Sequence, residues 1–125
     1  EIVDYLRHDL PLHVLDEEED LFPLLRRRCP VEDDIHDVLG LLSSDHRAEA
    51  ASGAHLADRL EAVSRGDDAL PMTPDLVRSI GNFVQRERRH IALENAVVLP
   101  IARLRLTARD LSGLSRRLAA RRGLS

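Results

Sequence analysis

Apolar residues recur every three or four positions along almost the whole 125-residue chain, the spacing that places them on one face of an α-helix. Three long segments and one short one carry this pattern, at about residues 1–28, 31–64, 74–105 and 108–122. No run has the alternation or the β-branched character of a β-strand. Aromatic residues are scarce, so Leu, Ala, Val and Ile must fill the core. We therefore predict a single all-α domain over 1–125, an up-down antiparallel helical bundle with a short C-terminal helix.

Residues that start or stop helices separate these segments. Cys29 and Pro30 mark the first turn, and Pro30 is well placed to begin the second helix. Thr73 followed by Pro74 is a suitable N-cap and first position for the third helix, and Thr107 is a suitable cap for the last. Three further prolines fall inside predicted helices, where we expect kinks: Pro11, Pro23 and Pro100.

Ionisable residues interrupt the apolar stripes at the middle of each long helix. His13 is followed four residues later by Glu17, and His90 is followed four residues later by Glu94. Residues four apart share a helix face, so each pair points an imidazole and a carboxylate in the same direction. His46 lies on the stripe of the second helix. Buried ionisable groups are costly unless something satisfies them, and a metal ion would do so.

The three histidines are predicted to lie at similar heights in the bundle. His13 is sixteen residues before the first turn and His46 is sixteen residues after it, about 24 Å along each helix. The second turn spans about residues 66–73, and His46 and His90 differ in their distance from it by about one helical turn. Loop geometry and proline kinks can absorb that difference, so the spacing predicts one layer of metal ligands.

Imidazoles and carboxylates without thiolates suit iron, manganese or zinc. Cys29, the only cysteine, is in a turn away from the histidines. Two carboxylates that face each other across a bundle can bridge two ions, so a carboxylate-bridged pair of iron ions is favoured. A mononuclear site, or one filled by zinc or manganese, is the alternative. Glu49, three residues after His46 on the same stripe, is a further candidate ligand or an orienting partner.

The charge pattern limits the classes of partner. The net charge is −4, with 18 basic residues against 22 acidic ones, which disfavours general nucleic-acid binding. No stretch approaches about 18 uninterrupted apolar residues, and no targeting segment is visible, so we expect a cytoplasmic protein without membrane contact. In the acidic run at 16–20, Asp16, Glu18 and Glu19 are interpreted as a solvated patch, as are the arginines of the last twenty residues.

Both His-x-x-x-Glu pairs are followed by a proline six residues after the glutamate. Together with His46, these segments resemble the hemerythrin-like family, also called the HHE cation-binding domain, over nearly the whole chain. The resemblance implies an up-down four-helix bundle with a non-haem di-iron centre. It further implies that Glu17 and Glu94 are the bridging carboxylates and that His13, His46 and His90 are terminal ligands.

Two features depart from the family pattern. The family supplies another histidine from a helix before the first His-x-x-x-Glu motif, whereas this chain opens at Glu1, without Met, inside a helical pattern. We expect that this helix is missing here. Either upstream residues or a homo-oligomer closes the open side, or the metal site is defective. Oxygen-carrying members have two histidines on the helix of His46, but here Leu42 and Ala50 occupy the positions four residues away. This argues against a dedicated oxygen carrier.

The resemblance implies a domain that binds or senses a small molecule such as oxygen or nitric oxide, or that takes part in iron handling. One alternative is a di-iron redox enzyme that acts on peroxide, and the sequence leaves enzymatic activity open. The other alternative is a helical interaction module without metal, in which the histidines are polar core residues.

Overall fold

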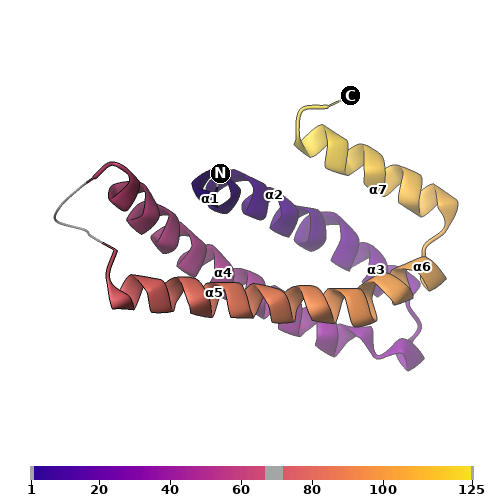
Figure 1. Ribbon diagram of the computed structural model, residues 1–125. Coiled ribbons are helices and arrows are strands. Elements are labelled where there is room, and N and C mark those ends of the chain that lie inside the picture. The colour runs from indigo at the N-terminus through magenta and orange to yellow at the C-terminus, as the bar shows by residue number, and fades with distance from the viewer. Residues whose placement is uncertain (1, 67–71, 125) are drawn as a thin grey trace.

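The computed structural model describes residues 2–66 and 72–124, and within these residues it contains helices and no strands. Three long helical segments lie beside one another, and a shorter helix approaches one end of them (Figure 1). The first long segment runs through α1 (Ile2–Asp4), η1 (Tyr5–Asp9), α2 (Leu10–Leu15), η2 (Asp16–Leu21) and α3 (Phe22–Arg28). The other elements are η3 (Val31–Asp33), α4 (Ile35–Ser64), α5 (Pro74–Leu93), η4 (Glu94–Val98), α6 (Leu99–Arg105) and α7 (Ala108–Arg121). The predicted all-α helical bundle is confirmed.

The interior prolines are accommodated by wide helical turns. Pro11 follows η1, Pro23 follows η2 and Pro100 follows η4, and all three η segments are π-helical. Proline has no amide hydrogen, and its ring clashes with the carbonyl four residues earlier, so an ordinary α-helical turn is strained there. In each case the residue before the proline donates its N–H to the carbonyl five residues back. Before Pro23 that carbonyl belongs to Glu17, and before Pro100 it belongs to Glu94. Both predicted glutamate ligands therefore accept the hydrogen bond of a π turn.

The helix starts show which local predictions hold. Thr73 accepts a hydrogen bond from the N–H of Leu76, and Thr107 forms a reciprocal capping box with Asp110, so both predicted caps are confirmed. The second long helix was expected from about residue 31. It begins instead at Ile35, because the chain first forms a short 3-10 turn and then passes through Asp34, whose φ of 51° is left-handed.

Two apolar clusters form the core and leave a polar layer between them. One joins α3, the start of α4 and the end of the third long helix: Phe22, Leu24, Leu25, Ile35, Leu39, Leu42, Val98, Ala102 and Leu106. The other joins η1 and α2 to the second half of α4 and the start of α5: Leu6, Leu10, Leu56, Ala57, Leu76 and Phe83. On every long helix the predicted metal ligands fall between these two sets, which fits the prediction that they share one layer.

α7 is held against the first helix by arginine–aspartate pairs. Arg117 and Arg121 donate to Asp20 at 2.8 and 2.7 Å, and Arg121 and Arg122 donate to Asp16 at 2.9 and 2.6 Å. Both aspartates are buried. The interpretation of Asp16 and of the C-terminal arginines as parts of solvated patches is therefore wrong at these positions. The two charge patterns neutralise each other across the bundle.

Hydropathy gives no sign of a membrane-spanning segment. Over the described ranges, 2–66 and 72–124, the helices are too short or too polar to cross a bilayer.

Candidate metal centre

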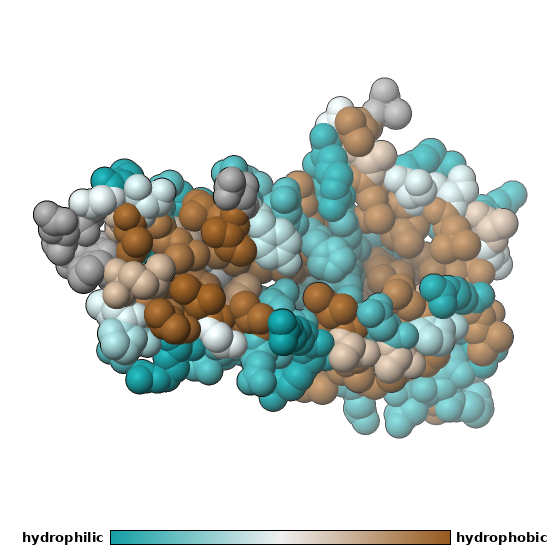
Figure 2. Space-filling model, in the orientation of Figure 1, coloured by the Kyte–Doolittle hydropathy of each residue, from teal (hydrophilic) through white to brown (hydrophobic). Residues whose placement is uncertain are grey.

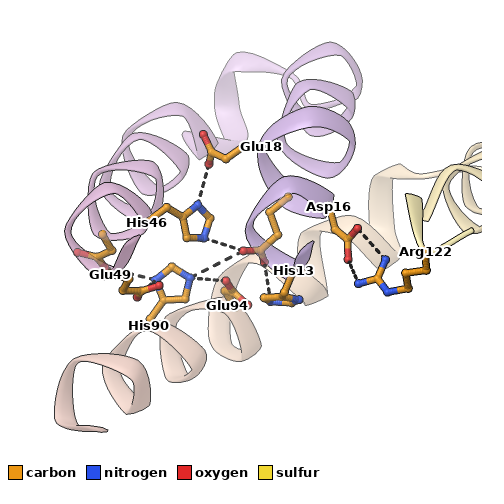
Figure 3. A network of polar contacts seen from close by, with 10 residues as sticks. His13, Asp16, Glu18, His46, Glu49, His90, Glu94 and Arg122 are labelled. Atoms are coloured by element: carbon orange, nitrogen blue, oxygen red, sulfur yellow. Dashed lines mark hydrogen bonds and ion pairs between the residues drawn. The ribbon is translucent and has the colours of Figure 1, made fainter. Parts of the chain in front are cut away.

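Four side chains from the three long helices converge in the polar layer. Glu17 comes from η2, His46 from α4, His90 from the end of α5 and Glu94 from the start of η4. One nitrogen or carboxylate oxygen of each lies within 4.8 Å of those of the other three. Figure 3 shows His46 on one helix and His90 and Glu94 on another, all three pointing toward one region. Two imidazoles and two carboxylates form a donor set that suits iron, zinc or manganese.

The shortest contacts join an imidazole to a carboxylate. Nε2 of His46 lies 2.8 Å from Oε1 of Glu17, and Nε2 of His90 lies 2.6 Å from Oε1 of Glu94. Nε2 of His90 is also 3.9 Å from the same Glu17 oxygen. The two imidazole rings are 4.8 Å apart between centroids. His46 and His90 thus both turn Nε2 toward the carboxylates of Glu17 and Glu94.

The orientation of His46 is set by residues outside the cluster. Its Nδ1 lies 2.9 Å from Oε2 of Glu18, a carboxylate that also accepts from the hydroxyl of Ser43. Phe22 stacks on the His46 ring with centroids 5.7 Å apart. A carboxylate at Nδ1 keeps the proton on that nitrogen and leaves the Nε2 lone pair for a metal, the arrangement common to metal-binding histidines. Glu18 is therefore an orienting residue, and its interpretation as a solvated residue is wrong.

Glu49 lies on the opposite edge of the His90 ring from the cluster. Its Oε1 is 3.4 Å from Nδ1 of His90, and Oδ2 of Asp45 is 3.5 Å from the same nitrogen. Glu49 is almost fully buried, yet neither its Oε1 nor Nδ1 of His90 has a hydrogen-bond partner within the described residues. The structure thus places Glu49 where it can orient His90, rather than among the four converging side chains.

His13 lies at the rim of the centre. Its Nε2 is 3.7 Å from Oε2 of Glu17, and its side chain is 56% exposed. Glu17 therefore faces a different imidazole with each oxygen, because its Oε1 is the atom that contacts His46.

Burial and charge shift the pKa values of the cluster strongly. Burial alone would raise the pKa of Glu17, but its contacts with His46 and His90 outweigh burial and hold the pKa well below its usual range. Burial acts to lower the pKa of His90, but Glu17 and Glu94 overcome it and raise the value to about 11. The pKa of His46 is raised in the same way, by Glu17 and Glu18. Without metal, protonated imidazoles therefore neutralise the carboxylates.

A second carboxylate pair lies behind His90. Burial, followed by hydrogen bonding to Glu87, raises the pKa of Glu49 to about 8. Glu49 is buried and Glu87 is half-buried, and two neighbouring carboxyl groups resist double ionisation, so Glu49 retains its proton near neutral pH. The buried Oε1 of Glu87, like that of Glu49, finds no hydrogen-bond partner in the described part of the chain.

The donor set fits a bound cation better than it fits a hydrogen-bonded polar core. Oε1 of Glu94 is within 2.6 Å of His90, but the pair lacks hydrogen-bonding geometry, and this buried oxygen has no such partner in 2–66 or 72–124. Burial raises the pKa of Glu94; the contact with His90 acts against this, and the neighbouring carboxylate of Glu17 raises the pKa further. A cation among these atoms would satisfy the orphaned oxygen and relieve the repulsion between the two carboxylates.

The family model for the hemerythrin HHE cation-binding domain matches residues 1–102. The chain belongs to this family. The predicted resemblance is therefore confirmed, and the protein is a hemerythrin-like cation-binding domain whose His/Glu cluster could hold a metal ion. No curated protein and no solved structure gave a significant match. α7, at 108–121, lies beyond the matched residues.

The sequence prediction included the four converging residues and named Glu49 as a ligand or orienting partner, but it missed Glu18. His13 and Glu49, both predicted as ligands, lie beside the four converging side chains at the distances given above. Glu18 was missed because the apolar stripe points to Glu17, one residue earlier and about 100° away around the helix. The useful pattern was Ser43 on α4, three residues before His46, which gives Glu18 a second donor on the same helix face.

Proposed function

We propose that this domain holds a non-haem di-iron centre that binds or senses a small molecule such as oxygen or nitric oxide. The observation that carries the proposal is the position of Glu17, with one oxygen 2.8 Å from His46 and the other 3.7 Å from His13. Such a carboxylate can bridge two ions, with Glu94 as the second bridge, which is the arrangement of dinuclear carboxylate bundles. His46 and His90 would serve the buried side, and His13 the exposed side.

The protein's own residues would orient and shield this centre. Glu18 would hold the proton on Nδ1 of His46, Glu49 lies against His90, and the apolar cluster around Phe22 would exclude water from the buried side. Bound iron would supply the open coordination position and the redox chemistry. The exposed position of His13 supports approach of the small molecule from that side.

The test is metal analysis of protein purified without chelators. We expect about two iron ions per chain, and an absorption spectrum that changes reversibly when the reduced protein meets oxygen or nitric oxide. His90→Ala is the control, since it removes a converging ligand and should abolish both properties. Iron-free protein that takes up no iron during reconstitution would refute the proposal.

A second candidate is a redox enzyme that acts on peroxide, supported by the Glu49–Glu87 pair. Its raised pKa, about 8 for Glu49, provides a proton donor 3.4 Å from His90 at neutral pH. The iron-loaded protein would then consume hydrogen peroxide, and Glu49→Ala would slow this reaction more than it lowers iron content. Peroxide consumption that is the same in the wild type and in His90→Ala would remove this candidate.

A further inference from the structure

A cavity of about 420 Å³ lies beside the candidate centre, under α7. Glu17 and Glu94 line it, together with His13. Its apolar walls come from the first helix, the third long helix and α7: Leu21, Ile91, Leu99, Leu114 and Leu118. In Figure 2, apolar surface gathers where α7 approaches the long helices. One cavity therefore joins proposed metal ligands to a hydrocarbon-like surface.

The cavity is larger than a diatomic ligand requires. A water molecule occupies about 30 Å³ of the liquid, and oxygen or nitric oxide is of similar size, so the space exceeds that need roughly tenfold. Cavities of about 300 Å³ and more commonly hold organic ligands. Because most of the walls are apolar, the occupant should carry a hydrocarbon body.

The polar and apolar walls are arranged along the bundle. His13 and Leu21 both line the cavity and are eight residues apart on the first helix, which corresponds to about 12 Å. His13, Asp16 and Glu17 make up the first half of this stretch, whereas Leu21 lies at its far end. The shape and chemistry therefore fit an extended molecule with a polar group at one end only.

The proposed metal centre, on which this inference rests, favours an anionic polar group. Asp16, Glu17 and Glu94 line the cavity, and the nearby arginines of α7 are paired with Asp16 and Asp20. The positive charge at the polar end would therefore come from the bound cations. A carboxylate is the simplest group that is both anionic and a good oxygen donor to such cations.

The helix that covers the cavity lies outside the residues that match the family model. Leu114 and Leu118 belong to α7, which lies outside the 102 residues that match the family. At the start of α7, Arg28 donates two hydrogen bonds of 2.9 Å to Asp110. With the arginine–aspartate pairs near the other end of α7, these bonds fix both ends of the roof. The cavity therefore depends on α7 as well as on the residues of the metal centre.

We propose that this cavity binds a straight-chain aliphatic carboxylate, with its carboxylate at the His13 end and its hydrocarbon chain against Leu21, Leu99, Leu114 and Leu118. The site makes the domain a receptor for an organic acid next to its metal centre. Selectivity for chain length comes from the leucines of α7.

The test uses the metal-loaded protein and a series of probes: acetate, butanoate, hexanoate and octanoate, titrated by calorimetry. Affinity should rise about fourfold for each added methylene group, the factor equivalent to about 0.8 kcal/mol per buried CH₂, until the cavity is filled. Metal content is measured on the same samples. Failure to retain metal overturns the proposed centre, whereas retained metal with affinity independent of chain length overturns only the cavity assignment.

Two tryptophan variants test the location of the chain. Leu118→Trp fills the apolar end and should weaken octanoate binding at least tenfold while leaving acetate binding unchanged. Leu111→Trp is the matched control, because Leu111 is on the same helix but 50% exposed and outside the cavity lining. If Leu118→Trp does not fold, Leu99→Trp fills the cavity from the facing wall. Equal octanoate affinity in the cavity-filling and control variants would overturn the assignment.

Discussion

The two His-x-x-x-Glu pairs have the same spacing but different surroundings. His90 is 4% exposed and lies 2.6 Å from Glu94, whereas the side chain of His13 is 56% exposed and lies 3.7 Å from Glu17. The difference comes from α4, which covers His90 with His46 and Glu49, while His13 faces the cavity under α7. The motif thus specifies which side chains share a helix face, whereas the neighbouring helix determines whether that face is buried.

The largest expected effect separates these two histidines. His90→Ala should lower metal affinity by more than about 100-fold and remove both ions, because loss even of an orienting residue commonly costs 10–100-fold. His13→Ala should leave one tightly bound ion and weaken only the second. Metal stoichiometry and affinity, measured by competition with a chromophoric chelator, distinguish these outcomes. Equal losses in the two variants would show that the bound metal draws His13 into an equivalent role.

The next largest effect is expected in the pH dependence of the stability of the metal-free protein, which depends on the protonation of His90 beside Glu94. The pKa of His90 is raised from its ordinary 6.5 to about 11, so the folded state holds this proton more tightly than the unfolded chain does. Its contribution to stability is therefore complete below pH 6.5 and is lost as the pH rises toward 11. The raised pKa of Glu49, about 8 against an ordinary 4.5, adds a loss of the same sign between those values.

Urea unfolding of the metal-free protein at pH 6, 8 and 10 measures this loss. His90→Gln should flatten the profile above pH 8, whereas His13→Gln should leave it as in the wild type. Stability that increases between pH 6 and 10 would contradict the assigned charges. Metal should bind more tightly as the pH rises over the same range, because it must displace the imidazole protons.

The positions of His46 and His90 in the core were largely predictable from the sequence, because they follow from local spacing along each helix. Apolar spacing placed His46 and His90 on core faces, and the turn distances brought them to one layer. The exposure of His13 was not predictable in this way, because a stripe shows which face is apolar and not which helix covers it. The π turns also escaped prediction, and each adds a residue to the turn, so the faces of the helix rotate after Glu17 and Glu94.

The position of α7 could not be read from local patterns either. Its contacts with the first helix join residues about a hundred positions apart, such as Asp16 and Arg122. Each partner lies in a run of like charge that looks solvated when it is considered alone. Only the folded arrangement brings the two runs together, which is why the cavity and its leucine roof emerge from the structure.

A smaller effect is expected at the orienting residue of the buried side. Glu18→Ala removes the carboxylate at Nδ1 of His46 and should lower metal affinity by about 10–100-fold without changing the number of ions. Glu19→Ala is the matched control, because Glu19 is the exposed neighbour in the same acidic run. Histidine NMR of the metal-free protein should show an altered His46 resonance only in Glu18→Ala. Equal metal affinity in the two variants would place the orientation of His46 elsewhere.

The smallest effect is expected on the exposed side, at the pairs that hold α7. Burial acts to raise the pKa of Asp16, but its hydrogen bonds with Arg122 and Arg121 outweigh burial and lower it. Asp16→Asn keeps the shape and removes the charge, so it should cost about 1 kcal/mol, a few degrees in Tm. Affinity for metal should not change, because His46 and His90 are untouched. A large loss of metal from this variant would mean that α7 also supports His46 and His90. The His13–Glu17 and His90–Glu94 pairs would then differ only in how exposed their histidines are.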